Sequence, residues 1–183
     1  MRTARISYGG AIHEAFEWEG RLKLDDGRIV EEKDVVWLTP IVPRTVFALG
    51  LNYADHAAEL AFDAPSEPLV FLKGPNTFIG HQGTTRRPAD VSYMHYECEL
   101  AVIIGKTARN VKKENAYNYI KGYSVANDYA IRDYLENYYR PNLRVKNRDT
   151  CTPFGPWLVD AADVADPMDL KLTTHVNNEL VQQ

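Results

Sequence analysis

The stretch that most constrains the fold is residues 94–105, where charged residues enter a segment whose second half predicts a buried strand. Side chains alternate between the two faces of a strand, so Glu97 and Glu99 are expected on the same face. Residues 100–104 that follow are all apolar. Two neighbouring carboxylates on a buried strand repel each other and resist desolvation unless something positive lies between them.

A hard divalent cation would satisfy this segment. Ligands that are all oxygen favour Mg²⁺, Mn²⁺ or Ca²⁺ over zinc, which prefers histidine and cysteine. The alternative is an exposed edge strand whose charged side chains face water, because such alternation is common in half-exposed strands. The segment alone leaves both interpretations open.

The length and the charge of the chain limit the classes of protein to which it can belong. A chain of 183 residues with 45% hydrophobic content is long enough for one domain with a sizeable core. The net charge of −4 comes without a basic block, so nucleic acid is not an expected partner. No apolar run approaches about 18 residues, so no membrane span is expected. The two cysteines, Cys98 and Cys151, lack metal-site spacing and no signal-peptide pattern is present, which favours a cytoplasmic protein with free thiols.

The first part of the chain, residues 1–43, predicts a small β module followed by a linker. Three short alternating segments precede Asp26-Gly27, a dipeptide typical of a hairpin turn. The prolines of Thr39-Pro40-Ile41-Val42-Pro43 favour an extended linker. We therefore expect the main domain over residues 44–183.

The first candidate for acid–base chemistry lies after a predicted buried strand, Thr45–Gly50. The composition of residues 51–60 is helical, and on a helix His56 and Glu59 stand at positions i and i+3. A carboxylate beside an imidazole orients it for proton transfer. The alternative is an ordinary surface helix with a solvated histidine.

Two further charged residues stand at strand ends. Asp128 ends the predicted strand 123–128 and is placed either to ligate a cation or to cap the helix predicted over 130–139. Lys73 ends the predicted strand 68–73, where it either reaches water or points at an anionic ligand. Downstream we predict a helix over 112–121 with Gly122 as its C-cap, and a hairpin over 170–181 with Asn177-Asn178 as its turn.

Taken together, five pieces of the sequence resemble the fumarylacetoacetate hydrolase family in order and spacing, over about residues 45–183. They are Gly50-x-Asn52-Tyr53-x-x-His56, the segment Tyr96-Glu97-x-Glu99-Leu100-Ala101-Val102-Ile103-Ile104-Gly105, Gly122-Tyr123-x-x-x-Asn127-Asp128, Arg132-Asp133, and Lys146 before Pro153-x-Gly155-Pro156-Trp157. The resemblance implies a mainly β (α+β) fold, a mixed β-roll or β-sandwich with short peripheral helices. Members of the family continue with a further strand-rich segment, so the C-terminal part of that fold is expected to be missing here.

The resemblance also implies site residues, a cofactor and an assembly. By position, Glu97, Glu99 and Asp128 are the expected ligands of Mg²⁺, with Mn²⁺ or Ca²⁺ as alternatives. The expected partners are a small 2-oxo acid substrate and a second copy of the chain in a homodimer. The residues expected to serve catalysis are His56, Glu59 and Lys146, and those expected to bind substrate are Tyr53, Lys73, Arg132 and Arg144.

The run from Asn127 to Lys146 is most similar to family members of the homoprotocatechuate (4-hydroxyphenylacetate) pathway. The predicted function is a Mg²⁺-dependent decarboxylase and isomerase of 2-oxo or 2-hydroxydienoate di- and tricarboxylic acids, acting through a metal-stabilised enolate. Arg132, Arg144 and Lys146 suit a substrate with several carboxylates. Two alternatives stay open: an acylpyruvate or fumarylpyruvate hydrolase, and a non-catalytic metal-stabilised β module.

Overall fold

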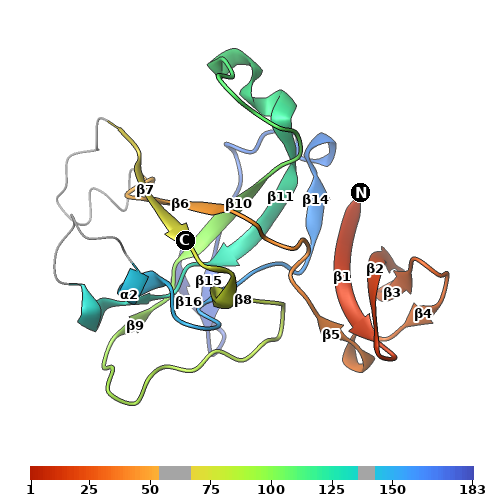
Figure 1. Cartoon of the computed structure of the whole chain (residues 1–183). Coiled ribbons are helices and arrows are strands. Elements are labelled where there is room, and N and C mark those ends of the chain that lie inside the picture. The colour runs from red at the N-terminus through yellow and green to blue at the C-terminus, as the bar shows by residue number, and fades with distance from the viewer. Residues whose placement is uncertain (54–66, 136–142) are drawn as a thin grey trace.

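Strands dominate the computed structural model of the chain, which describes residues 1–53, 67–135 and 143–183 (Figure 1). The strands are β1 (Arg2–Tyr8), β2 (Ala11–Trp18), β3 (Arg21–Leu24), β4 (Ile29–Val30), β5 (Val36–Trp37), β6 (Val46–Gly50), β7 (Leu69–Lys73), β8 (Phe78–Ile79), β9 (Met94–His95), β10 (Cys98–Ile104), β11 (Ile120–Asn127), β12 (Ala130–Ile131), β13 (Thr152–Pro153), β14 (Leu158–Asp160), β15 (Thr174–Val176) and β16 (Glu179–Gln182). Helices in the described part are short: 3₁₀ turns η1 (Glu32–Asp34), η2 (Pro75–Thr77), η3 (Lys113–Tyr119), η4 (Arg132–Tyr134) and η5 (Ala161–Asp163), and α2 (Leu143–Lys146). The predicted mainly β fold with short helices is confirmed.

The largest sheet in the described part has eight strands. Its order is β10-β11-β14-β1-β2-β3-β4, and β5 pairs with β1. The smaller pairs are β6 with β7, β9 with β12, β8 with β13, and β15 with β16. Because β1 bonds to β14, the N-terminal strands continue the same sheet that contains β10 and β11, and Figure 1 shows them gathered at one end of it.

The N-terminal module has a core of its own. Alternation places Ala4 and Ile6 of β1 on the same face as Leu22 and Leu24 of β3, and these side chains are almost completely buried. The predicted turn is present: the Gly27 N–H donates to the Leu24 carbonyl, and Gly27 has a φ of 89° that only glycine adopts without strain. This local prediction is confirmed.

A second, smaller core lies where the long antiparallel strands meet the loop after β13. It contains Ile103, Phe154 and Leu158. Gly122 of β11 allows β14 to approach closely, since a Cβ there would stand 2.2 Å from the Val159 carbonyl oxygen. The hairpin β15–β16 is also as predicted, with Asn177 and Asn178 both at positive φ in its turn.

The structure corrects four local predictions. The strand expected over 94–105 is interrupted at residues 96 and 97, so Glu97 lies between β9 and β10. In place of the helix predicted over 112–121, Lys113–Tyr119 form the 3₁₀ helix η3, and β11 begins at Ile120 and includes Gly122, which therefore caps no helix. The predicted helix 130–139 is wrong in its described part, which forms β12 and η4. The strand β6 is only half buried, with Phe47 and Leu49 exposed.

Tertiary pairing explains the broken strand and the missing helix. Ala130 and Ile131 pair with His95 and Met94 in an antiparallel ladder, so residues that could be helical are held extended. Residues 54–66 and 136–142, including His56 and Glu59, lie outside the described residues.

Candidate metal and substrate site

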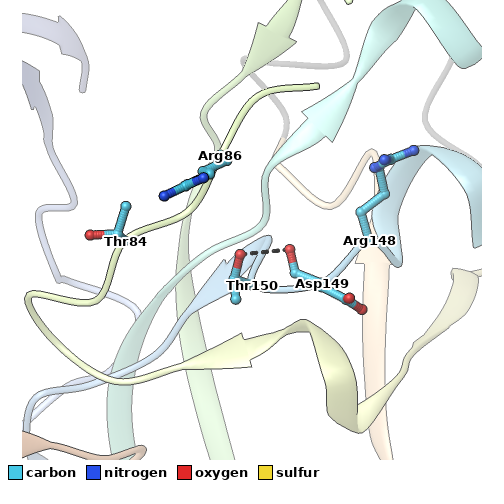
Figure 2. A pocket seen from close by; sticks show the side chains of 5 residues that line it. All are labelled: Thr84, Arg86, Arg148, Asp149 and Thr150. Atoms are coloured by element: carbon cyan, nitrogen blue, oxygen red, sulfur yellow. Dashed lines mark hydrogen bonds between the residues drawn. The ribbon is translucent and has the colours of Figure 1, made fainter. Parts of the chain in front are cut away.

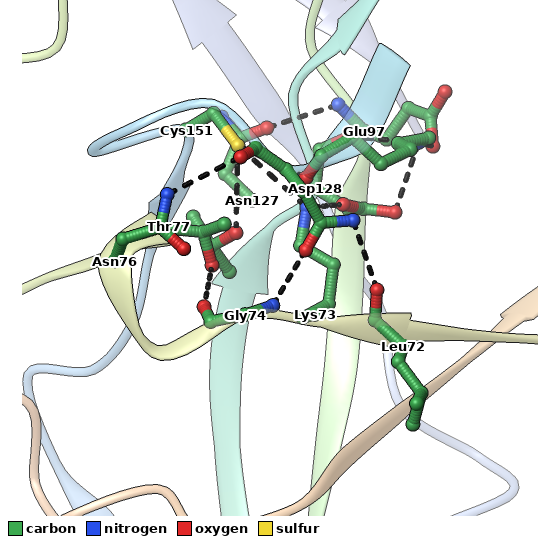
Figure 3. A network of polar contacts seen from close by, with 12 residues as sticks. Leu72, Lys73, Gly74, Asn76, Thr77, Glu97, Asn127, Asp128 and Cys151 are labelled. Carbon is green, nitrogen blue, oxygen red and sulfur yellow. Dashed lines mark hydrogen bonds and ion pairs between the residues drawn. The ribbon is translucent and has the colours of Figure 1, made fainter. Parts of the chain in front are cut away.

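Two of the predicted carboxylates, Glu97 and Asp128, meet near the ends of β10, β11 and α2. Figure 3 shows them with the buried Lys73. The buried Lys146 contacts both carboxylates. Asp128 directly follows β11, and its backbone N–H donates to the Glu97 carbonyl at 2.8 Å. The Glu97 N–H in turn donates to Asn127 Oδ1 at 3.0 Å. One backbone bond and one bond to the Asn127 side chain therefore hold Glu97 beside Asp128, although Glu97 is not part of a strand.

Each carboxylate oxygen of Asp128 accepts a hydrogen bond from a lysine ammonium group. Lys73 Nζ donates to Oδ1 at 2.7 Å, and Lys146 Nζ donates to Oδ2 at 2.9 Å. The side chain of Lys73 is 2% exposed and that of Lys146 is 7% exposed. Lysine is rarely so buried unless it is paired, so Asp128 is the counter-ion that these two lysines require.

Glu97 is also neutralised on both oxygens. Arg132 donates through NH2 to Oε1 at 2.7 Å, and Lys146 donates to Oε2. Lys146 thus bridges Glu97 and Asp128 and supplies the positive charge that the sequence led us to expect from a metal ion alone.

Glu99 has a different environment. Among the described residues, no ion pair joins it to a lysine or arginine. Burial, followed by the negative charges of Glu97 and Asp128, raises the pKa of Glu99 to about 7. The nearby Lys146 ammonium and the Tyr53 hydroxyl oppose this rise.

Tyr53 lies against the start of β10. Its hydroxyl accepts a bond from the Leu100 N–H at 3.5 Å and contacts Glu99. Burial, and next the charge of Glu99, raises the pKa of Tyr53, so the phenol stays protonated. Tyr53 can therefore donate to an oxygen at this position.

The three carboxylates have the ligand chemistry of a hard divalent cation. They offer only oxygen atoms, and each carboxylate oxygen that accepts one lysine or arginine bond keeps a second lone pair. A cation near Glu99 would relieve the repulsion that raises its pKa. The three carboxylates thus have the right ligand chemistry, but their oxygen atoms do not all lie within 4.8 Å of one another in this structure. The role of Glu97, Glu99 and Asp128 as metal ligands stays a prediction.

A different group in the described residues has its ligand atoms close enough for a metal. His13, Asp25 and Asp26 place one ligand atom each within 4.8 Å of the others. Asp26 is bound by the Arg28 guanidinium at 2.5 and 2.9 Å, which lowers the pKa of Asp26 to about 2. Arg28 already supplies the positive charge there, so this cluster is an ion-pair network on the N-terminal module.

The remaining predicted substrate residues are held in different ways. Arg132 and Lys73 pair with the carboxylates of the site. The Arg144 guanidinium stacks on Tyr134, 4.0 Å from the ring centroid, on the exposed side of α2. Substrate binding by these three residues stays a prediction.

Sequence reasoning did not single out Asn147 or give Cys151 a role. The Cys151 thiol donates to the Lys146 carbonyl at 3.1 Å and lies 3.7 Å from Lys73 Nζ. Asn147 bonds to the backbone on both sides of Lys73. The only sequence signal for either residue is its nearness to Lys146, since the bonds span up to 78 positions of the chain.

An open groove of about 660 Å³ lies beyond the end of α2 (Figure 2). It is lined by Thr84, Arg86, Arg148, Asp149 and Thr150. Figure 2 shows Arg86 and Arg148 apart from each other, with their side chains pointing in different directions, and Asp149 next to Thr150. The groove therefore does not bring its positive charges together at one point. No helix in the described part of the chain is long and apolar enough to cross a membrane.

Comparison with known proteins identifies the family. Residues 45–183 match the family model described as "Fumarylacetoacetate (FAA) hydrolase C-terminal". An uncharacterised protein of Archaeoglobus fulgidus is 40% identical over 180 residues, which cover 98% of this chain and 70% of that protein. The chain belongs to the fumarylacetoacetate hydrolase family, as its motifs led us to expect.

More specific relatives share a smaller part of their length. The chain is 66% identical over 139 residues to the 4-hydroxyphenylacetate degradation bifunctional isomerase/decarboxylase of Salmonella dublin, covering 76% of this chain and 32% of that protein. Among solved structures, 2-hydroxyhepta-2,4-diene-1,7-dioate isomerase from Mycobacterium marinum is 32% identical with a TM-score of 0.82, covering 100% of this chain and 73% of that one. The chain thus spans about a third of the Salmonella protein.

Proposed function

We propose that the protein containing this chain is a metal-dependent decarboxylase and isomerase of 2-oxo or 2-hydroxydienoate di- and tricarboxylic acids, in 4-hydroxyphenylacetate catabolism. The observation that carries the proposal is the carboxylate cluster, in which two lysines and one arginine neutralise Glu97 and Asp128 but not Glu99. The bifunctional isomerase/decarboxylases of Salmonella dublin and Escherichia coli, at 66% and 57% identity, support it.

The proposed cofactor is Mg²⁺, with Mn²⁺ as an alternative, held by Glu97, Glu99 and Asp128. When bound, such an ion polarises the carbonyl oxygen of a 2-oxo acid and so favours the enolate that both reactions need. The same enolate serves isomerisation, in which a proton moves along the diene, and decarboxylation, in which a carbon–carbon bond breaks and CO₂ leaves.

The residues of the chain supply positioning and proton transfer. Lys146 Nζ donates to Glu97 Oε2, to Asp128 Oδ2 and to the Asp128 carbonyl, which uses all three of its N–H groups. Its proposed contribution is the positive charge that it holds beside a developing oxyanion. Arg132 keeps Glu97 in place through its bond to Oε1. Tyr53 can donate from its protonated hydroxyl. The dyad His56–Glu59 stays the proposed general acid–base pair, worth about 10²–10⁴ in rate.

Product identification with the full-length protein tests the proposal. With Mg²⁺ or Mn²⁺, a 2-hydroxydienoate or 5-oxo-tricarboxylate substrate should yield a shifted double bond or CO₂. Lys146→Met should lower kcat by about 10² or more, whereas Lys106→Met, at an exposed position, should leave it unchanged.

Other outcomes would contradict the proposal, and each would support one of the two alternative functions. Pyruvate plus a second acid would establish the hydrolase alternative, and no turnover of any 2-oxo diacid would favour a non-catalytic module. The proposed homodimer is tested separately by light scattering of the same protein.

A further inference from the structure

The side chain of Asn147 forms hydrogen bonds to the backbone on both sides of Lys73. The Gly74 N–H donates to Asn147 Oδ1 at 2.5 Å, and Asn147 Nδ2 donates to the Leu72 carbonyl at 2.9 Å. These two backbone groups stand on either side of Lys73. A side-chain amide offers an acceptor and donors at a fixed spacing, so Asn147 bonds to the end of β7 as a neighbouring strand would. The backbone is therefore fixed at the residue before Lys73 and at the residue after it.

The same short segment also carries the second lysine of the site. Asn147 directly follows Lys146, and its N–H donates to the Leu143 carbonyl at 2.9 Å, which closes the turn of α2. The Lys146 carbonyl accepts a bond from Lys73 Nζ. Two connections, one through the amide of Asn147 and one through this carbonyl, join β7 to the end of α2.

The joined elements place one ammonium group on each oxygen of Asp128 (Figure 3). Lys73 approaches Oδ1 and Lys146 approaches Oδ2, at 2.7 and 2.9 Å. Lysine has a long flexible side chain, so its ammonium is placed accurately only if the backbone is fixed. The spacing of the two backbones therefore decides the orientation of the Asp128 carboxylate.

We propose that Asn147 is a positioning residue that fixes Lys73 relative to Lys146 and thereby orients Asp128. The proposal extends the proposed function, in which Asp128 ligates a divalent cation. Partners that orient a metal ligand without touching the metal typically contribute 10- to 100-fold in metal affinity. The structural part of the proposal, the placement of the two ammonium groups, does not depend on the metal.

Asn147→Ala and a matched control test it in the intact protein. Asn147→Ala removes both amide bonds to β7. Asn76→Ala removes two donated bonds of the same junction, to the Asn147 carbonyl at 3.2 Å and to Asp149 Oδ1 at 2.7 Å. The Asn76 side chain lies next to Gly74 but donates no bond to Leu72 or Gly74. Both variants lose two hydrogen bonds, so an effect seen only in Asn147→Ala is due to the bonds between Asn147 and the backbone on either side of Lys73.

The first measurement is ¹⁵N NMR of the lysine side chains without metal, because buried, hydrogen-bonded ammonium groups exchange slowly with water. The wild type should show protected signals for Lys73 and Lys146, assigned by Lys→Arg variants. Asn147→Ala should lose the Lys73 signal, and Asn76→Ala should keep it. If Asn147→Ala does not fold, Asn147→Asp, which keeps an acceptor for the Gly74 N–H, should weaken the same signal.

The second measurement is Mn²⁺ affinity by calorimetry. Asn147→Ala should weaken binding about 10- to 100-fold relative to wild type, with Asn76→Ala close to wild type. Unchanged Lys73 signal and Mn²⁺ affinity in Asn147→Ala would overturn the proposal, as would equal losses in both variants. If the wild type binds no Mn²⁺, the proposed metal site fails, while the NMR comparison still decides the role of Asn147.

Discussion

Replacing Glu99 by glutamine should stabilise the metal-free protein at pH values above 4.5, with the full effect above about pH 7. The pKa of Glu99 is raised from 4.5 to about 7, first by burial and then by Glu97 and Asp128. Since one pKa unit corresponds to about 1.4 kcal/mol, a rise from 4.5 to about 7 corresponds to about 3.5 kcal/mol. Because Glu99 is partly exposed, water screens its charge, and about 2–3 kcal/mol is the expected range.

The sign follows from which state binds the proton. Below pH 4.5 Glu99 is protonated in both states, and no penalty arises. Between pH 4.5 and 7 the unfolded chain releases the proton while the folded chain keeps it, so this group's contribution to stability falls as the pH rises. Above pH 7 the full penalty is present. Glu99→Gln removes it and should therefore gain stability only at the higher pH.

Urea denaturation in the presence of a chelator, at pH 5 and pH 8, measures the difference. We expect Glu99→Gln and wild type to be similar at pH 5, with the variant about 2–3 kcal/mol more stable at pH 8. Glu97→Gln is the control, because it leaves Arg132 and Lys146 without their carboxylate and should destabilise the fold by about 3–5 kcal/mol. A Glu99→Gln effect that is equal at the two pH values would refute the reasoning.

Three further predictions concern the scaffold. Leu24→Ala should lower the free energy of unfolding by about 2–5 kcal/mol, because its side chain is almost completely buried in the N-terminal core. Gly122→Ala should cost about 1–3 kcal/mol in the same urea assay, since the new Cβ would press on the Val159 carbonyl. Asp133 should titrate at about pH 2 by carboxyl ¹³C NMR, because the Ser92 hydroxyl and backbone N–H donate to it. Its contribution to stability is present above pH 3.8 and lost as the pH falls toward 2, and Ser92→Ala should raise its pKa.

The sequence by itself determined the features that depend on neighbouring residues. The turn at Asp26-Gly27 and the hairpin turn at Asn177-Asn178 follow from residues that tolerate positive φ. The three short segments expected before the first of these turns are present as the strands β1, β2 and β3. Membership of the family could also be predicted, because the order and spacing of the motifs are properties of the sequence alone.

Only the tertiary structure decided how the carboxylates are neutralised. Arg132 reaches Glu97 across 35 positions, and Lys73 reaches Asp128 across 55. Those bonds depend on which strands pair, and the pairing of β9 with β12 is what interrupts the strand at Glu97 and keeps residues 130 and 131 extended. Local pattern predicts that charges need partners, but long-range pairing selects the partner, which is why Asn147 could not be found from the sequence.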